Sequence, residues 1–172
     1  ELKNVRGKWS SNGAGGIVMD PTNGEIMAIA WNPGFDLNNF KESEVGAFDN
    51  PIVEGVYEMG SIIKPLTMAA GIDSGAVTQS STYYDAGYLV LNSKRTVAMQ
   101  EILSQSLNTG VAYIAHKMGN EKFSEYMKSF GIGTETGIDL PNEGRGLIEN
   151  LESKRDIEMA TASYGQGIAL TP

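Results

Sequence analysis

The chain has no cysteine and a single histidine, His116, among its 172 residues. Without cysteine there is no thiol nucleophile and no disulfide framework, and a zinc site is not expected. With one histidine, a serine-histidine-aspartate triad would depend on that residue alone. An activated serine in this chain therefore needs another base, and lysine can serve when burial lowers its pKa.

Several other features are also missing from the sequence. It contains no long apolar run and no signal peptide. It contains no phosphate loop, and Gly13-Ala14-Gly15-Gly16 precedes a strand pattern where a dinucleotide loop would follow one. The net charge of −8 argues against a nucleic-acid-binding surface. We expect no cofactor, no metal and no nucleic acid. A chain of this length with 41% hydrophobic residues can form one domain with a sizeable core.

Ser61 and Lys64 are the first candidate catalytic pair. They lie three residues apart, and Pro65 must sit in the first turn of any helix that contains it. Gly60 permits a sharp turn before that helix. The spacing places Ser61 at the positive end of the helix dipole, with Lys64 within reach of its hydroxyl. The alternative is that Ser61 caps the helix and Lys64 is a solvated surface residue.

Ser106 and Asn108 form a second candidate pair. They flank a loop between two helical patterns, where both side chains can point into one cleft. A serine there can relay a proton, and an asparagine amide can hold a substrate amide. The alternative is an ordinary turn sequence.

The two pairs, in this order, resemble the penicillin-binding protein transpeptidases and serine β-lactamases. Two further landmarks point to the class B penicillin-binding proteins. The stretch 16–30 resembles their opening hairpin with its Asp-Pro-x-x-Gly turn. The stretch 165–172 resembles their late Gly-Gln-Gly and Thr-Pro landmark. The resemblance covers nearly the whole chain.

One motif of that family is missing. The lysine-threonine-glycine or lysine-serine-glycine triplet lies, in the family, on a strand beyond the Gly-Gln-Gly landmark, and the sequence ends at Pro172. We therefore expect the chain to be a fragment that is truncated before this motif. The resemblance implies a parent protein with a membrane anchor outside this stretch, acting at the extracytoplasmic face of the bacterial membrane.

The resemblance implies an α+β fold of the penicillin-binding transpeptidase and β-lactamase type, with an antiparallel sheet and helices, here an incomplete portion of it. We expect a leading linker over 1–14 and the N-terminal and helical part of a transpeptidase domain over 15–172. Strands are predicted within 15–31, joined at Asn23-Gly24, and at 88–91. Helices are predicted over 61–71, 97–105, 110–118 and 121–130, the second with Thr96 as its N-cap.

The activity implied by the resemblance is peptidoglycan D,D-transpeptidation through a serine acyl-enzyme. Ser61 would be the nucleophile, Lys64 the base and Ser106 the proton relay, while Asn108 would bind the donor peptide. The implied partners are peptidoglycan stem peptides, β-lactam antibiotics and cell-wall synthesis proteins. Three alternatives stay open: a serine β-lactamase or D,D-carboxypeptidase, a β-lactam sensor domain, and a non-catalytic interaction module.

Overall fold

The computed structural model describes residues 1–43, 45–85 and 95–172. The chain divides into two compact units. The first contains residues 1–55 and 139–143, and the second contains residues 56–138 and 144–172. Each unit has its own small antiparallel sheet. The strand predicted at 88–91 lies outside the described residues.

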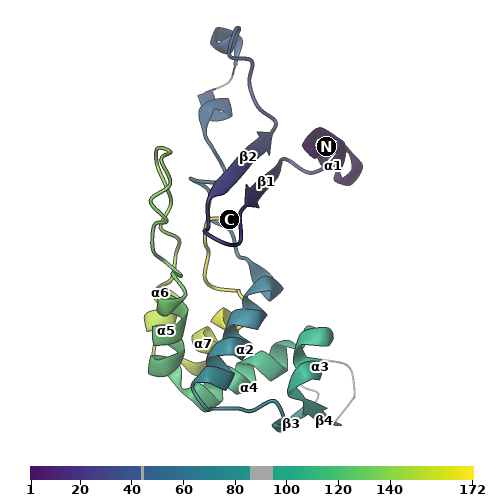
Figure 1. Cartoon of the computed structure of the whole chain (residues 1–172), viewed down its shortest axis with the longest axis vertical. Coiled ribbons are helices and arrows are strands. Elements are labelled where there is room, and N and C mark those ends of the chain that lie inside the picture. The colour runs from purple at the N-terminus through teal and green to yellow at the C-terminus, as the bar shows by residue number, and fades with distance from the viewer. Residues whose placement is uncertain (44, 86–94) are drawn as a thin grey trace. The chain divides into compact units, whose positions relative to one another are not determined.

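The first unit is built on a β-hairpin. Strands β1 (Ala14–Met19) and β2 (Ile26–Asn32) run antiparallel (Figure 1). In their register, Ile17 is paired with Ile29. This hairpin was predicted within 15–31. The segment expected to be a linker contains a helix, α1 (Leu2–Trp9), which packs against the hairpin and buries no residue fully.

Polar side chains and short turns complete the first unit. In the hairpin turn, the Asp20 carboxylate accepts hydrogen bonds from the backbone N–H and the hydroxyl of Thr22. Beyond β2, two 3₁₀ turns follow, η1 (Phe40–Glu42) and η2 (Val45–Phe48). Phe48 packs edge-on against Phe35, with ring centroids 4.7 Å apart.

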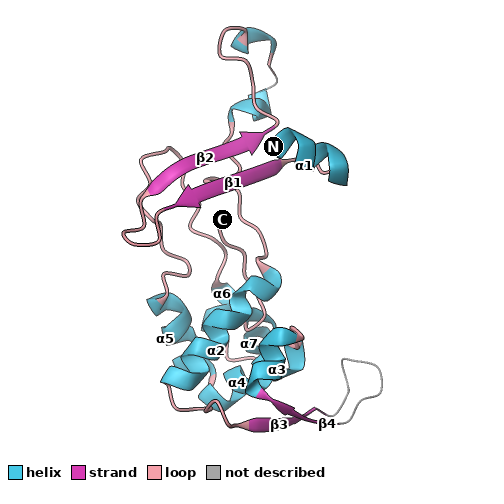
Figure 2. Ribbon diagram, turned by 45° about the vertical axis from the view of Figure 1, so that its right-hand side comes forward, coloured by secondary structure: helices cyan, strands magenta, loops and turns pink. Residues whose placement is uncertain are grey.

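The second unit is mainly helical. Helices α2 (Lys64–Asp73), α4 (Asn108–Met118), α5 (Asn120–Ser129) and α7 (Asp156–Ala162) pack around one core, and the short helix α6 (Glu149–Glu152) lies against α5 and α7 (Figure 2). Apolar residues spaced three and four apart on these helices share a face, and most of them are buried. Among them are Val111, Ile114, Ala115, Phe123 and Met127. Tyr126 is only partly buried, and Phe130, which follows α5, is exposed.

A second hairpin replaces part of a predicted helix. Strand β3 (Thr82–Asp85) pairs antiparallel with β4 (Arg95–Ala98), and only then does α3 (Met99–Ser104) begin. The helix predicted over 97–105 therefore begins two residues later than expected, and Ala98 occupies the N-cap position in place of Thr96. Val97 and Tyr83 are paired and both buried, so tertiary pairing outweighs the local helical pattern.

Candidate active site

Ser61 lies in a tight turn that leads directly into α2. The 3₁₀ turn η3 covers Gly60–Ile63, and α2 begins at Lys64 with Pro65 in its first turn. Lys64 is helical although a proline follows it, and Ile63 occupies the N-cap position. The reading of Ser61 as a helix cap is therefore excluded. Ser61 is exposed.

Lys64 is buried at the centre of the helical unit. Only 2% of its surface is exposed, which excludes the reading of Lys64 as a solvated surface residue. Its amine nitrogen donates to the Ser106 carbonyl oxygen at 2.6 Å and lies 2.8 Å from the Ser106 hydroxyl oxygen. Burial lowers the pKa of Lys64, because the charged form loses hydration. Buried lysines with lowered pKa values are typical of general bases.

Ser106 is held in an unusual backbone conformation. Its φ is +53°, a region that residues other than glycine rarely adopt. It follows α3, where the Ser106 N–H bonds to Leu103 O at 3.1 Å and the Leu107 N–H bonds to Ile102 O at 2.9 Å. This pair of bonds is the Schellman pattern, which normally places glycine at the left-handed position. A serine there turns both its carbonyl and its hydroxyl toward Lys64.

Asn108 is the first residue of α4, and its side chain is exposed. In the described residues no hydrogen bond joins it to Ser61 or Lys64. Nor does one join the Ser61 hydroxyl to the Lys64 amine. The structure thus brings Lys64 and Ser106 into direct contact. Ser61 lies in the turn just before α2, and Asn108 is the first residue of α4.

A late segment of the chain contacts the turn that holds Ser61. The backbones of Tyr57 and Leu170 exchange two hydrogen bonds of 2.8 and 2.9 Å. The Gly60 N–H donates to Gly165 O at 3.0 Å. Sequence reasoning marked the Gly-Gln-Gly stretch only as a family landmark. Nothing in its local pattern indicated which part of the chain it touches.

Among the described residues, no three or more His, Cys, Asp or Glu side chains form a group that could hold a metal ion. His116 is exposed near the end of α4, as its position off the apolar stripe predicts. None of the helices in the described part of the chain is long and apolar enough to cross a membrane.

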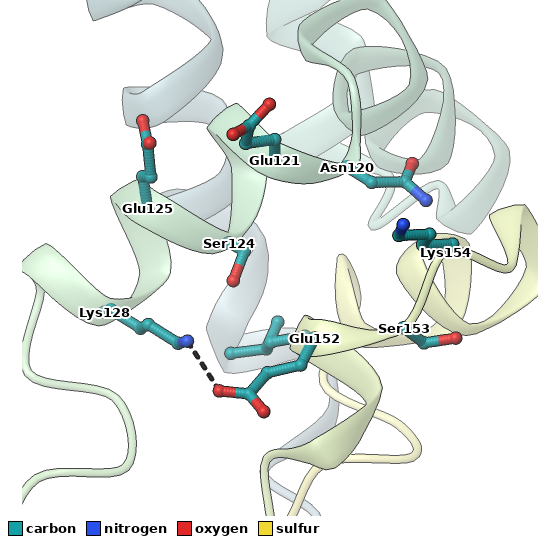
Figure 3. A pocket seen from close by; sticks show the side chains of 9 residues that line it. Asn120, Glu121, Ser124, Glu125, Lys128, Glu152, Ser153 and Lys154 are labelled. Carbon is teal, nitrogen blue, oxygen red and sulfur yellow. Dashed lines mark hydrogen bonds and ion pairs between the residues drawn. The ribbon is translucent and has the colours of Figure 1, made fainter.

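A separate groove lies between α5 and α6 and has a volume of about 580 Å³. Figure 3 shows Lys128 and Glu152 facing each other across it, joined by an ion pair of 2.8 Å. Both side chains are largely exposed, and such pairs contribute little to stability. Three glutamates and two lysines line the groove, and none of the four candidate site residues does.

Comparison with known proteins places the chain in a family and finds similar relatives. Residues 14–172 match the family "Penicillin binding protein transpeptidase domain". Stage V sporulation protein D of Bacillus subtilis is 32% identical, with 100% of this chain and 28% of the relative covered. Peptidoglycan D,D-transpeptidase FtsI of Escherichia coli K12 is 28% identical, with 100% and 30% covered. The chain thus spans less than a third of the length of these relatives.

Solved structures of related proteins share the fold. A putative peptidoglycan glycosyltransferase from Atopobium parvulum superposes with a TM-score of 0.87 at 28% identity, over 99% of this chain and 42% of the other. The TP domain of penicillin-binding protein 3 from Burkholderia pseudomallei gives 0.79 at 23% identity, over 99% and 50%. The predicted α+β transpeptidase fold and the resemblance to class B penicillin-binding proteins are confirmed.

Proposed function

Because the chain belongs to the penicillin-binding protein transpeptidase domain family, we propose that it is part of a peptidoglycan D,D-transpeptidase that works through a serine acyl-enzyme. Ser61 is the nucleophile, Lys64 its base, Ser106 the proton relay and Asn108 a ligand of the donor peptide. The names of the relatives, among them a peptidoglycan D,D-transpeptidase, support the reaction class.

The observation that carries the proposal is the contact between Lys64 and Ser106. A neutral lysine amine has two N–H donors and one lone pair. Lys64 directs hydrogen bonds of 2.6 and 2.8 Å to the carbonyl and hydroxyl oxygens of Ser106, which accounts for both donors. The lone pair remains for the proton of Ser61. Burial supports this assignment, because a lowered pKa raises the share of neutral amine at neutral pH.

The first half-reaction forms the acyl-enzyme. Lys64 Nζ takes the proton of the Ser61 hydroxyl as its oxygen attacks the carbonyl carbon of the penultimate D-alanine. The Ser61 N–H supports the negative charge on the carbonyl oxygen. The peptide C–N bond then breaks. The Ser106 hydroxyl donates its proton to the leaving nitrogen and receives one from Lys64, so that D-alanine departs as a free amine.

The second half-reaction transfers the acyl group. An amine of a neighbouring stem peptide attacks the ester carbonyl, gives a proton to Lys64 through Ser106 and forms the crosslink. The ester C–O bond breaks, and the Ser61 oxygen regains its proton from Lys64. A β-lactam reacts in the first half only. Its ring opens when the C–N bond breaks, and the nitrogen stays attached to the acyl group.

The setting of this reaction follows from its substrate. Peptidoglycan stem peptides lie outside the bacterial cytoplasm, so the parent protein works at the extracytoplasmic face of the membrane. The relatives carry names connected with cell-wall synthesis and sporulation, and partners from cell-wall synthesis fit this setting.

Labelling by a fluorescent penicillin tests the proposal in the full-length protein. Ser61→Ala should abolish the covalent label, while Ser124→Ala, in helix α5, should leave it unchanged. Incubation with a stem pentapeptide and an amine acceptor, followed by mass spectrometry, separates the readings. A crosslinked product supports transpeptidation. Hydrolysed product alone indicates a carboxypeptidase, and labelling without turnover of any stem peptide indicates a sensor. Retained covalent labelling of Ser61→Ala would overturn the assignment of the nucleophile.

A further inference from the structure

Two segments far apart in the sequence are joined on both sides of Ser61. The first is the nucleophile segment, residues 57–67, which includes Ser61 and Lys64. The second is residues 163–170, which we call the clasp. The clasp begins at Ser163, the C-cap residue of α7, and includes the Gly-Gln-Gly stretch. Their contacts run in antiparallel order along the two segments.

Before Ser61, the clasp is attached at two neighbouring positions. Tyr57 and Leu170 form an antiparallel backbone bridge. One residue further, the Glu58 carboxylate accepts a hydrogen bond of 2.7 Å from the Gly167 N–H. A bond from an N–H to a carboxylate is stronger than one between neutral groups. Glu58 is exposed, so its side chain is held in place by this bond and not by packing.

Immediately before Ser61, the two backbones touch. Gly165 has a φ of +77°, and its carbonyl oxygen accepts a hydrogen bond of 3.0 Å from the Gly60 N–H. A Cβ atom at Gly165 would collide with Gly60 O and lie 2.7 Å from Gly60 N. Both are backbone atoms with no freedom to rotate away. Any side chain at Gly165 must therefore push aside the residue next to the nucleophile.

After Ser61, the clasp is attached to the body of α2. The Thr67 hydroxyl donates to Ser163 O at 2.7 Å, and both residues are fully buried. Thr67 lies one helical turn beyond Lys64, on the same face. The clasp thus holds the turn before Ser61 and the helix after Lys64 at once.

We propose that the clasp positions the Ser61 hydroxyl against Lys64, with Glu58 and Gly165 as positioning residues. The inference rests on the proposed function of Ser61 and Lys64. Lys64 is fixed by Ser106, but the Ser61 side chain makes no hydrogen bond of its own in the described residues. The location of its oxygen therefore depends on the backbone of η3. The N-cap residue of this turn, Met59, makes no capping hydrogen bond with its side chain. That backbone is held by the clasp.

The geometry gives this positioning a large effect on rate. A displacement of about 1 Å at a reacting group can reduce a rate on the order of 10²-fold. The hydrogen bonds of Glu58 and Gly165 involve neither the Lys64 amine nor Ser106. Loosening them should therefore lower the maximal acylation rate and leave the pH midpoint of acylation where it is.

Substitutions at Glu58 in the full-length protein supply the main test, with a fluorescent penicillin as the probe. Glu58→Ala removes the bond to Gly167 and should lower the maximal acylation rate roughly 10-fold, with a smaller change in the concentration for half-maximal rate. Glu58→Gln keeps an oxygen acceptor and should restore most of the rate. Glu149→Ala, an exposed glutamate at the start of α6, is the matched control and should react like the wild type.

Glycine substitutions supply a second, independent test. Gly165→Ala combines a positive φ with the collision against Gly60, and the rate should fall on the order of 10²-fold. Gly75→Ala is the matched control, since Gly75 has a φ of +74° but no heavy atom within 4 Å of the place that a Cβ atom would take. Both variants carry the same backbone strain, and only one disturbs the nucleophile.

The outcomes separate the clasp from the proposed function. If the wild type is labelled and Glu58→Ala reacts normally, or Glu58→Gln is as slow as Glu58→Ala, the positioning role is wrong. If the wild type is not labelled at all, the proposed function fails, and amide hydrogen exchange at 60–63 then tests the clasp alone. Exchange there should accelerate in Glu58→Ala and stay unchanged in Glu149→Ala. Unchanged exchange in both variants would overturn the positioning role of the clasp. This test does not depend on Gly165→Ala, so it still applies if that variant does not fold.

Discussion

The two units of the chain stabilise their residues in different ways. In the helical unit, side chains are enclosed by neighbouring helices, and even the charged residue Lys64 is only 2% exposed. In the hairpin unit, the strands leave much of their apolar surface exposed, and Met27 on β2 is 67% exposed. Burial of side chains is therefore the main source of order in the helical unit. Backbone pairing and turn hydrogen bonds are the main source in the hairpin unit.

This difference has a chemical consequence. All four candidate site residues belong to the helical unit, where low exposure can change the acidity of a side chain. Lys64 has a lowered pKa because it is desolvated. In the hairpin unit, Asp20 also has a lowered pKa, but hydrogen bonds from Thr22 cause it. The comparison predicts which substitutions change chemistry, which change stability and which change neither.

The largest effect should come from Lys64→Arg. Arginine keeps the positive charge but cannot be deprotonated in a protein, so it cannot accept the Ser61 proton. We expect acylation by penicillin to fall on the order of 10³-fold or more, consistent with the loss of a general base. Stopped-flow or gel-based acylation kinetics on the full-length protein measure this directly.

The pH profile of the wild type completes the test of Lys64. Its pKa is lowered by burial, and only the neutral amine is a base. Acylation should therefore be constant above the folded pKa and fall about tenfold per pH unit below it. The midpoint should lie below the ordinary pKa of lysine. A wild-type rate in Lys64→Arg would show that Lys64 acts only as a charge, and a midpoint at the ordinary lysine value would contradict the lowered pKa.

The next largest effect is on stability, and it is tested by truncating a methionine in each unit. Met127 on α5 is fully buried, whereas Met27 on β2 is largely exposed. Met127→Ala should reduce the free energy of unfolding by about 2–5 kcal/mol, because it leaves a cavity. Met27→Ala should change it by less than about 0.5 kcal/mol. Urea titrations followed by circular dichroism measure both, and equal losses would show that the exposed strand face is also covered.

The start of the helix that carries Lys64 could be predicted from the sequence because its signals are local. A serine and a lysine three apart, followed by proline, define the start of a helix within a few residues. The burial of Lys64 and its contact with Ser106 could not be predicted in the same way. They join positions 42 residues apart and depend on how α2 and α4 pack.

The errors in the fold have the same origin. The hairpin at 14–32 was predicted because its turn residues and alternating strands are local signals. Helix α1 was missed because its residues are mostly polar and bury nothing fully. The last two residues of β4 were predicted as helix because Val97 fits both patterns, and its pairing with Tyr83 decides between them.

A smaller effect is expected at Ser106, where backbone strain and chemistry can be separated. Ser106→Gly and Ser106→Ala both remove the hydroxyl, and both should slow acylation. Glycine adopts a φ of +53° without penalty, whereas alanine does not. The glycine variant should therefore be more stable than the alanine variant by about 1 kcal/mol. Thermal or urea unfolding of the two variants measures the difference, and equal stability would show that the loop relaxes to a negative φ.

The smallest effect concerns the turn of the exposed hairpin. The Thr22 hydroxyl is the main cause of the lowered pKa of Asp20, and the Thr22 N–H adds to it. Since the folded pKa is lowered, this interaction supports the turn at pH values above the ordinary carboxyl pKa and is lost as the pH falls through the folded value. Thr22→Val removes the hydroxyl but keeps the N–H, so the Asp20 pKa should return part of the way to its ordinary value. An NMR titration of the Asp20 carboxyl carbon in the wild type and the variant measures this change. An Asp20 pKa that stays equally low in Thr22→Val would mean that the hydroxyl does not act on the carboxylate. It would also remove the contrast between a pKa set by hydrogen bonds and one set by burial.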